Sequence, residues 1–285
     1  MIDFVKIQVL WPPIKRLLEH SKLDFRVELN EETSEVHSQY KTAKFQHLKF
    51  QIINGKYLNI SGSLHKFWHN GINHDDYQYL ELKDTIKFLE TNFGIDPKNC
   101  IIRNLEFGIN IETINDPDYY LSRMIDFKGK ALSEMTGKRK SIGIKCQMAQ
   151  YIIKIYNKSY QCNLTKNTMR IEIKVIRMKF IEKAGIRTLK DLFHQKKLAL
   201  LGILLNDLFN SVLMYDPDLE LSNSDRYLYL AGQSPLFWER MKHEKHPSYT
   251  YIRRKFKEIC NTNGNTYQNE LLEQIQQKWE QLLNL

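Results

Sequence analysis

The most informative part of the chain is Gln150-Tyr151-Ile152-Ile153-Lys154-Ile155-Tyr156-Asn157-Lys158, followed a dozen residues later by Met169-Arg170-Ile171-Glu172-Ile173-Lys174. Both runs alternate apolar and polar residues, and this period predicts half-buried β-strands. We expect antiparallel strands over residues 151–158 and 168–177, joined by a polar loop over residues 159–167. A third run, residues 100–113, has the same period and predicts a strong strand.

Period two also sorts the side chains of each strand onto two faces. In the third strand the apolar face carries Ile101, Leu105, Phe107, Ile109 and Ile111, and Arg103 interrupts it. The opposite, polar faces carry Lys154, Tyr156 and Lys158 in the first strand, Arg170, Glu172 and Lys174 in the second, and Asn104, Glu106, Asn110 and Glu112 in the third.

The rest of the chain predicts an α+β fold with an antiparallel-sheet core, flanking helices and a small helical C-terminal region. Asn54-Gly55 supplies the type I′ turn of a β-hairpin between residues 45–53 and 56–61. Helices are expected over residues 80–93, 118–127, 187–213, 234–243, 248–260 and 266–283, with a mobile basic connection over residues 128–140. The composition changes after Asp216-Pro217, which predicts a catalytic domain over residues 1–215 and a helical region over residues 216–285.

The charge favours a polyanionic partner. The formal net charge is +9, and residues 128–179 hold thirteen lysines or arginines but only two acids. The four cysteines form no CxxC pair or zinc-spaced cluster, and no signal-peptide pattern or membrane span is evident. We therefore expect a protein of the reducing cytoplasm without a membrane partner.

The polar residues suit phosphoryl transfer. Tyr156 lies among lysines that can hold a phosphate, and the carboxylates of Glu106 and Glu172 can hold a hard divalent cation. A phenol also needs nearby positive charge to act as a nucleophile at neutral pH. The same residues fit a purely structural interpretation, because Glu172 opposite lysines can be a cross-strand ion pair and Glu106 can face solvent.

Four blocks of the chain, in order, resemble the replication initiators of filamentous phages (the gene II endonuclease family) and the rolling-circle plasmid initiators of the Rep_trans type. The blocks lie between residues 50 and 195. The first block is Leu58 to Asn73, which contains Ser63-Leu64-His65-Lys66 and Gly71-Ile72-Asn73. The second is Ile102 to Asn110, which contains one acidic residue, and the third is Ile153 to Lys158, which contains the tyrosine. The fourth is Met169 to Lys174, followed by Gly185-Ile186.

The resemblance implies that Tyr156 nicks one strand of origin DNA and stays joined to the 5′-phosphate, leaving a 3′-hydroxyl for synthesis. Glu106 and Glu172 would then bind Mg²⁺ or Mn²⁺, and Lys158 would position or neutralise the phosphate. The implied partners are double-stranded origin DNA, the single-stranded nick site, and the helicase and polymerase of a bacterial host cell, with a homodimer as a further option.

The chain also departs from the family. Ile72 stands where the phage proteins have a histidine, the acidic residue is Glu106 rather than aspartate, and the two-histidine motif of HUH endonucleases is missing. We therefore expect His65 and His69 to be surface or phosphate-contact residues. Tyr160 is a minor candidate for a second nucleophile, about 13 Å from Tyr156 if the strand continues at about 3.3 Å per residue.

DNA contacts are expected from basic residues near the site and in the C-terminal region. Aromatic residues accompany the basic cluster of residues 249–257, a mixture suited to the DNA backbone, although solvated helix faces would look the same. The expected contacts are Lys66, Lys138, Arg139, Lys140, Lys154, Arg170, Lys174, Arg253, Arg254 and Lys255. Two alternatives stay open: a relaxase that mobilises a mobile element, and a non-catalytic replication repressor.

Overall fold

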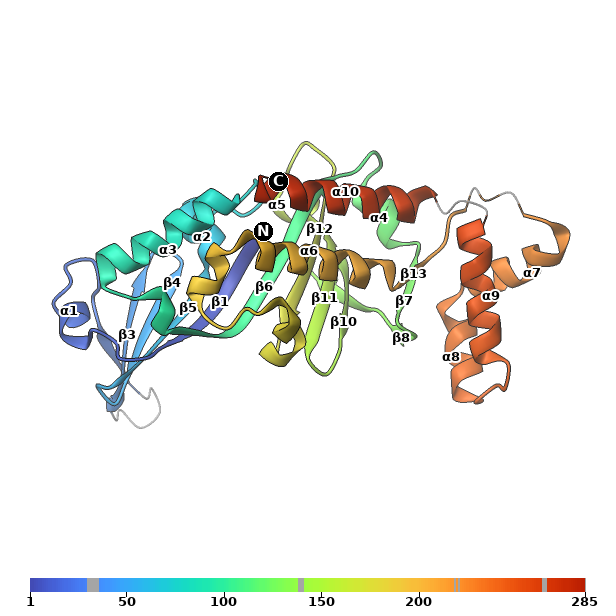
Figure 1. Cartoon of the computed structure of the whole chain (residues 1–285). Helices are drawn as coiled ribbons and strands as arrows, with labels where there is room; N and C mark the ends of the chain where they lie inside the picture. Colours follow the sequence, from blue (N-terminus) through green and yellow to red (C-terminus); the bar gives the residue numbers. More distant parts are fainter. Residues whose placement is uncertain (30–35, 138–140, 218, 220, 263–265, 285) are drawn as a thin grey trace.

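One long antiparallel sheet organises the molecule (Figure 1). The structure is a computed structural model that describes residues 1–29, 36–137, 141–217, 219, 221–262 and 266–284. Within these residues ten strands pair in the order β2-β3-β4-β5-β1-β6-β12-β11-β10-β9. Their bounds are β1 Ile2–Val9, β2 Arg26–Leu29, β3 Val36–Phe45, β4 Leu48–Ile53, β5 Tyr57–Ser63, β6 Cys100–Glu112, β9 Ser133–Thr136, β10 Ser141–Gln147, β11 Tyr151–Asn157 and β12 Thr168–Val175. The α+β class with an antiparallel sheet is confirmed.

The predicted hairpin is β4 and β5. Asn54 and Gly55 have φ angles of 51° and 63°, as a type I′ turn requires. Ile53 pairs with Tyr57, so Asn54, Gly55 and Lys56 form a three-residue connection, one residue longer than the predicted two-residue turn. Leu48, Phe50 and Ile52 are buried on one face and alternate with half-buried residues, so this hairpin contributes one apolar face to the core.

Strand β6 contains a bulge that the sequence period did not predict. Lys6 of β1 pairs with Asn104, but Ile7 pairs with Ile102, so Arg103 is an extra residue on β6. The bulge reverses the alternation at this point. Ile102 therefore joins the apolar face with 2% exposure, whereas Ile101 is only half-buried.

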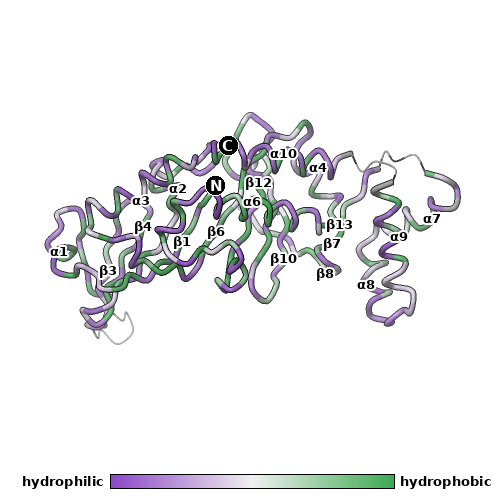
Figure 2. Tube along the Cα trace, viewed as in Figure 1, coloured by the Kyte–Doolittle hydropathy of each residue, from purple (hydrophilic) through white to green (hydrophobic). Residues whose placement is uncertain are grey.

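Helices cover the apolar face of the sheet (Figure 1). They are α3 Tyr79–Phe93, α6 Gln195–Asn210 and α10 Thr266–Leu283, together with the 3-10 segments η2 Met178–Ala184 and η3 Leu189–Phe193. Trp279 of α10 packs against Phe107 of β6 and donates a hydrogen bond from Nε1 to Leu198 O of α6, at 3.1 Å. The polar faces of the strands point away from these helices, and the alternation can be followed along the chain in Figure 2.

Several predicted elements differ from the structure. Residues 118–127 form α4 Pro117–Leu121 and then strand β7 Met124–Phe127, not one helix. The described part of the basic connection forms β8 Lys130–Ala131 and β9, because the Lys128-Gly129 turn closes a β7–β8 hairpin. Residues 187–213 divide into η3, α6 and strand β13 Val212–Met214, which pairs with β7.

Further short elements complete the description. They are α1 Ile14–Leu18, α2 Leu64–Trp68, η1 Pro97–Asn99 and α5 Lys158–Cys162, the last lying where a polar loop was predicted. None of the helices in the described ranges is long and apolar enough to cross a bilayer.

A group of three helices stands beyond the sheet: α7 Asn223–Gly232, α8 Pro235–His243 and α9 Tyr249–Thr262 (Figure 1). Tyr229, Trp238 and Phe256 of this group form a small apolar cluster together with Ile125 of β7 and Leu213 of β13. The end of the group between α8 and α9 is hydrophilic (Figure 2). Helix α10 instead packs on α6 and β6, so residues 216–285 are not one structural group. The division into domains near residue 216 stays a prediction.

Candidate functional site

The sheet brings the predicted polar residues together on the face away from the helices. Along β11 and β12, Tyr156 pairs with Arg170 and Lys154 pairs with Glu172. Lys174 of β12 pairs in turn with Glu106 of β6. Directly paired residues of antiparallel strands share a face, so three strands contribute to one cluster, as their period predicts.

The two glutamates are bound by basic side chains. Glu106 Oε1 is 3.0 Å from Lys174 Nζ, and its Oε2 is 3.1 Å from Lys154 Nζ. Glu172 Oε1 is 2.7 Å from Lys154 Nζ, and its Oε2 is 2.8 Å from Arg170 Nε. All four carboxylate oxygens therefore have a cationic partner. A metal ion bound here would have to displace a lysine or an arginine.

The charges of these partners act differently on the two glutamates. Burial raises the pKa of Glu172, but the nearby charges of Arg170 and Lys154 outweigh burial and hold that pKa well below its usual range. Burial and the charge of Glu172 raise the pKa of Glu106. Glu172 is thus the firmly ionised member of the pair, and it anchors the cationic side chains.

Arg170 is the centre of the buried part of the cluster. Its guanidinium donates to Glu172, to Asp3 Oδ2 at 2.8 Å and to Asn110 Oδ1 at 3.2 Å. The Arg170 side chain is 3% exposed. Sequence reasoning missed Asp3, which a bulge in β1 between Ile2 and Val5 places at the site. Asp3 is a single acid at the start of an otherwise apolar strand, and this was the signal that the sequence offered.

Tyr156 lies directly beside this cluster and is buried, with 6% exposure. Burial, reinforced by the charge of Glu172, raises the pKa of its phenol above the ordinary range, while Arg170 acts in the opposite direction. Lys158 Nζ is 5.9 Å from the centroid of the tyrosine ring. Two basic side chains thus lie near the phenol, but burial outweighs the charge of Arg170, so the phenol is held in its neutral form.

Lys158 reaches the site from α5 rather than from the strand. Asn157 caps this helix by accepting a hydrogen bond from Tyr160 N at 2.9 Å. Lys158 is 2% exposed, and burial lowers the pKa of its amine, as does the charge of Arg170. Because the strand ends before Lys158, the estimated strand spacing between Tyr156 and Tyr160 does not apply.

Two glycines allow the strands to approach each other at the functional residues. Gly108 pairs with Glu172, and a Cβ atom at Gly108 would lie 2.2 Å from Ile171 O. Gly143 pairs with Tyr156, and a Cβ atom at Gly143 would lie 2.4 Å from the Cβ of that tyrosine. A larger residue at either position would displace the strand that carries the site.

A second cluster contains two histidines and an aspartate. His65 lies on α2, and His69 follows one turn later as the C-cap residue of this helix. Ser63 caps the other end by accepting a hydrogen bond from Lys66 N. His65 Nε2 is 2.8 Å from Asp75 Oδ1, and His69 Nδ1 is 2.5 Å from Asp75 Oδ2. Within the part of the chain that the structure describes, these three residues form the one group that could hold a metal ion.

His65 and His69 were expected to be surface or phosphate-contact residues. His65 is buried with 2% exposure, so it is not a surface residue, whereas His69 is half-buried with 15% exposure, and contact with a phosphate stays a prediction. Burial lowers the pKa of His65 to about 3, so that its imidazole is neutral. A neutral imidazole is the form that binds metals. The i, i+4 spacing of the histidines on a helix was a usable signal, but Asp75 joins them only through the fold.

Asn73 links the two clusters. Its Nδ2 donates to Asp3 Oδ2 at 3.1 Å, and its Oδ1 accepts from Lys158 Nζ at 2.9 Å. Asn110 Nδ2 donates to the backbone oxygens of Asn73 and Asp75 at 3.4 and 3.5 Å. The tyrosine, the basic residues and the His-His-Asp group are therefore one continuous polar site.

The remaining predicted DNA contacts lie in different settings. Lys66 is half-buried on α2, and Arg254 is exposed on α9. Lys255 Nζ is 3.3 Å from Asp225 Oδ1. Lys138, Arg139 and Lys140 lie outside the described residues.

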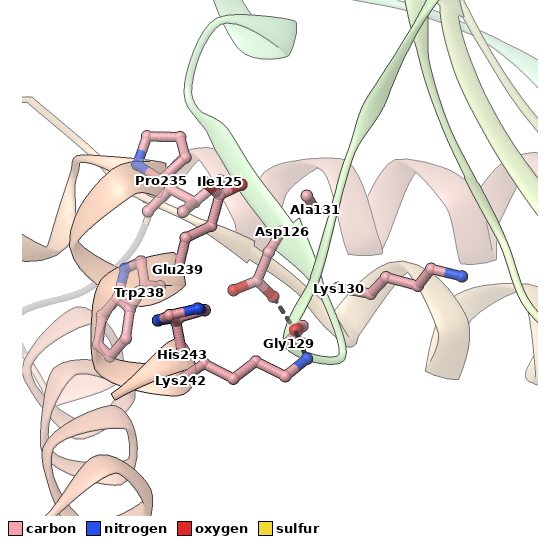
Figure 3. A pocket seen from close by; sticks show the side chains of 10 residues that line it. All are labelled: Ile125, Asp126, Gly129, Lys130, Ala131, Pro235, Trp238, Glu239, Lys242 and His243. Carbon is pink, nitrogen blue, oxygen red and sulfur yellow. Dashed lines mark hydrogen bonds between the residues drawn. The ribbon is translucent and has the colours of Figure 1, made fainter. Parts of the chain in front are cut away.

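Arg253, predicted to contact DNA, binds an acid of β7. Its guanidinium makes two 2.5 Å hydrogen bonds to the carboxylate of Asp126, which is buried, while Arg253 itself is half-buried. Asp126 also accepts from Gly129 N, and Lys242 Nζ donates to Gly129 O (Figure 3). These contacts join the three-helix group to the β7–β8 hairpin beside a pocket of about 300 Å³.

No protein-family model and no curated protein matches the chain. Among solved structures, a rolling circle replication initiator protein from Geobacillus stearothermophilus is similar over 87% of this chain and 96% of its own. The sequence identity is 12% and the TM-score is 0.45. A likeness of this size assigns neither a family nor a function to the chain.

Proposed function

We propose that this protein is a replication initiator of a phage or plasmid, which nicks and rejoins one strand of origin DNA through Tyr156. One observation carries the proposal. Tyr156 lies opposite Arg170 and beside Lys158, on a polar sheet face that Asn73 connects to a His-His-Asp group. Nucleophile, phosphate-binding cations and metal donors are thus present in one site.

The chemistry is a transfer of one phosphoester bond. The phenol oxygen of Tyr156 forms a bond to the scissile phosphorus as the bond from phosphorus to the 3′ oxygen breaks. The phenol loses its proton and the leaving 3′ oxygen gains one. The bond energy is kept in the 5′-phosphotyrosine, so a new 3′-hydroxyl can reverse the step and reseal the strand without ATP.

The basic residues have distinct parts in this step. Arg170 is held in place by Glu172 and Asp3, so its charge is fixed next to the phenol before DNA binds. Such preorganised charge stabilises the negative charge that develops in the transition state. Lys158, held by Asn73, neutralises the phosphate. In this proposal Glu106 and Glu172 hold basic side chains in place and do not bind the metal ion, which differs from the metal-ligand role predicted for them.

A divalent cation fits the His-His-Asp group. Two imidazoles and a carboxylate favour Mn²⁺ over Mg²⁺, because Mg²⁺ prefers oxygen ligands. When bound, the cation supplies a Lewis acid that polarises the non-bridging phosphate oxygens. His65, His69 and Asp75 would hold it, and Glu81, whose Oε1 accepts a 3.0 Å hydrogen bond from His69 Nε2, would orient the ring.

The partners follow from the reaction. Cutting one origin strand requires double-stranded origin DNA and a single-stranded nick site. The free 3′-hydroxyl is the primer that a host polymerase extends, and a host helicase opens the duplex ahead of it. A homodimer could supply two tyrosines for successive cleavages.

The test is covalent capture of DNA. Supercoiled and single-stranded DNA carrying the replicon's own origin is incubated with wild type, Tyr156→Phe or Tyr160→Phe in Mn²⁺. We expect a protein–DNA adduct in wild type and in the Tyr160→Phe control, which lies on α5, and none in Tyr156→Phe. Tight origin binding without cleavage by any variant would support the repressor alternative. An adduct in a protein that does not sustain plasmid replication would support the relaxase alternative.

A further inference from the structure

We infer that helix α6 forms the interface between two copies of this chain, which meet antiparallel about a two-fold axis. A homodimer is compatible with the proposed function, but nothing in that chemistry requires one or selects its surface. Helix α6 covers the apolar face of the sheet (Figure 1), whereas Tyr156 lies on the polar face. We call the surface the α6 stripe. It consists of Lys196, Leu200, Ile203 and Asp207.

Helix α6 is more apolar than a single packed face requires. Residues 198–205 are eight in a row without a polar side chain. Leu198, Leu201 and Leu205 are fully buried in the main core, as expected for the inner side of an amphipathic helix. Leu200 and Ile203 lie on the outer side and are 46% and 58% exposed. A helix that is apolar on all sides is normally covered on all sides, so the outer side of α6 is suited to a partner.

The residues of the α6 stripe form one line along this outer side. They have the spacing i, i+4, i+7 and i+11 along the chain. At about 3.6 residues per turn, this spacing keeps them within about 60° of one another around the helix axis. The line begins with the positive charge of Lys196, has two apolar residues in the middle, and ends with the negative charge of Asp207.

The α6 stripe is complementary to a reversed copy of itself. Lys196 and Asp207 are equally far from the midpoint between residues 201 and 202, and so are Leu200 and Ile203. A two-fold axis through that midpoint therefore places Lys196 opposite the partner's Asp207, and the symmetry makes this ion pair twice. Leu200 meets the partner's Ile203 between the two ion pairs. Charge and apolar contacts thus match in the same antiparallel register.

Both charges of the α6 stripe are available for a partner. Lys196 and Asp207 are exposed, and neither forms an ion pair within the described ranges of the chain. The next residue along the helix, Lys197, is instead bound to Asp191 of η3. Charged pairs at the rim of an interface add little affinity, but they select the orientation and the register of the partners. Here they select the antiparallel arrangement over a parallel one, which would place like charges together.

Helix α10 extends the surface beside the stripe. Gly202 of α6 lets α10 approach, because a Cβ atom at this position would lie 2.3 Å from Trp279 Cδ1. A hollow of about 320 Å³ lies between the two helices, and Ala199 and Leu283 contribute to its lining. Two α6 helices packed about 8–10 Å apart would bring the partner over this hollow. A stable dimer buries about 800 Å² per partner, so α10 has to share the interface with the α6 stripe.

The proposed dimer has a consequence for the site. Its helices lie between the two sheets, so the polar faces of the sheets point away from each other. If Tyr156 is the nucleophile of the proposed function, the two tyrosines lie on opposite outer sides of the dimer and cannot meet at one phosphate. Each copy would act on its own segment of DNA, and the dimer would hold two segments at once.

The test is sedimentation equilibrium of the purified protein without DNA. Lys196→Glu and Asp207→Lys each place like charges opposite each other twice in the dimer, so either variant alone should raise the dimer Kd by about tenfold or more. An equal mixture of the two variants should form a heterodimer with the wild-type Kd, because the reversed charges then face each other and the unchanged charges do too. Leu200→Asp should abolish the dimer by placing two charges at its centre.

The matched control combines Arg240→Glu and Glu244→Lys, the same charge reversals at exposed positions of α8, and should keep the wild-type Kd. A wild-type protein that is monomeric at every concentration, a mixture no tighter than its components, or a dimer that survives Leu200→Asp would overturn the inference. The proposed function fails separately. A monomer that forms the Tyr156 adduct would refute only the dimer, and a dimer that never forms an adduct would refute only the cleavage.

Discussion

Replacing Glu172 with glutamine should lower stability without affecting metal binding. The carboxylate is 5% exposed and contacts Lys154 and Arg170 at 2.7 and 2.8 Å, so Glu172→Gln leaves buried positive charge without its partner. Removing one member of a buried ion pair costs about 3–5 kcal/mol. For 285 residues the unfolding entropy is about 0.6 kcal/mol/K, so the melting temperature should fall by about 5–8 °C.

The assay is thermal unfolding with and without Mn²⁺. At about 100 times its Kd, a ligand adds about 2.7 kcal/mol, which here is about 4–5 °C. Glu172→Gln should melt lower than wild type but show the same increase on adding Mn²⁺. Asp75→Asn, in the His-His-Asp group, should lose that increase. If Glu172→Gln loses the increase and Asp75→Asn keeps it, the metal is bound by the glutamates and the reasoning is wrong.

Three further predictions concern the same contacts. Arg253→Ala should lower the free energy of unfolding by about 3–5 kcal/mol, because it leaves the buried carboxylate of Asp126 without its cation. Arg254→Ala, at an exposed position, should change it by less than about 0.5 kcal/mol. Equal losses in urea unfolding would contradict the ion pair. Gly143→Ala should cost about 1–3 kcal/mol and abolish adduct formation by moving Tyr156; wild-type cleavage would exclude the close approach of the strands. The pKa of Glu172 is depressed in the folded state, so the stability that its carboxylate contributes is complete above the ordinary pKa of 4.5 and is lost as the pH falls below that value. The stability difference between wild type and Glu172→Gln should therefore shrink in acid. A constant difference down to pH ~2 would refute the ion pairs.

Much of the sheet followed from the sequence period. The alternation in residues 151–157 and 168–175 predicts which side chains share a face, and the register confirms it through the Tyr156–Arg170 and Lys154–Glu172 pairs. Period two holds along an unbroken strand because backbone geometry alone fixes it, and it fails at the bulges of β1 and β6. The Asn54-Gly55 hairpin was likewise predictable, since the turn conformation depends on those two residues.

Elements that depend on distant partners were not predictable in this way. Residues 124–127 form a strand because β13, far along the chain, pairs with them. Arg253 was predicted to contact DNA, and its ion pair with Asp126 of the β7–β8 hairpin could not be read from the sequence. In both cases a local pattern is compatible with two environments, and a long-range contact selects one of them.

Local sequence patterns were enough to predict the antiparallel strands, their polar and apolar faces, and the basic charge that favours a polyanionic partner. The roles open to individual residues depended on the fold, which binds Glu106 and Glu172 to cationic side chains and places Asp75 between His65 and His69. The face that a side chain occupies follows from the local backbone, whereas ion pairing and metal-donor geometry depend on residues that only folding brings together.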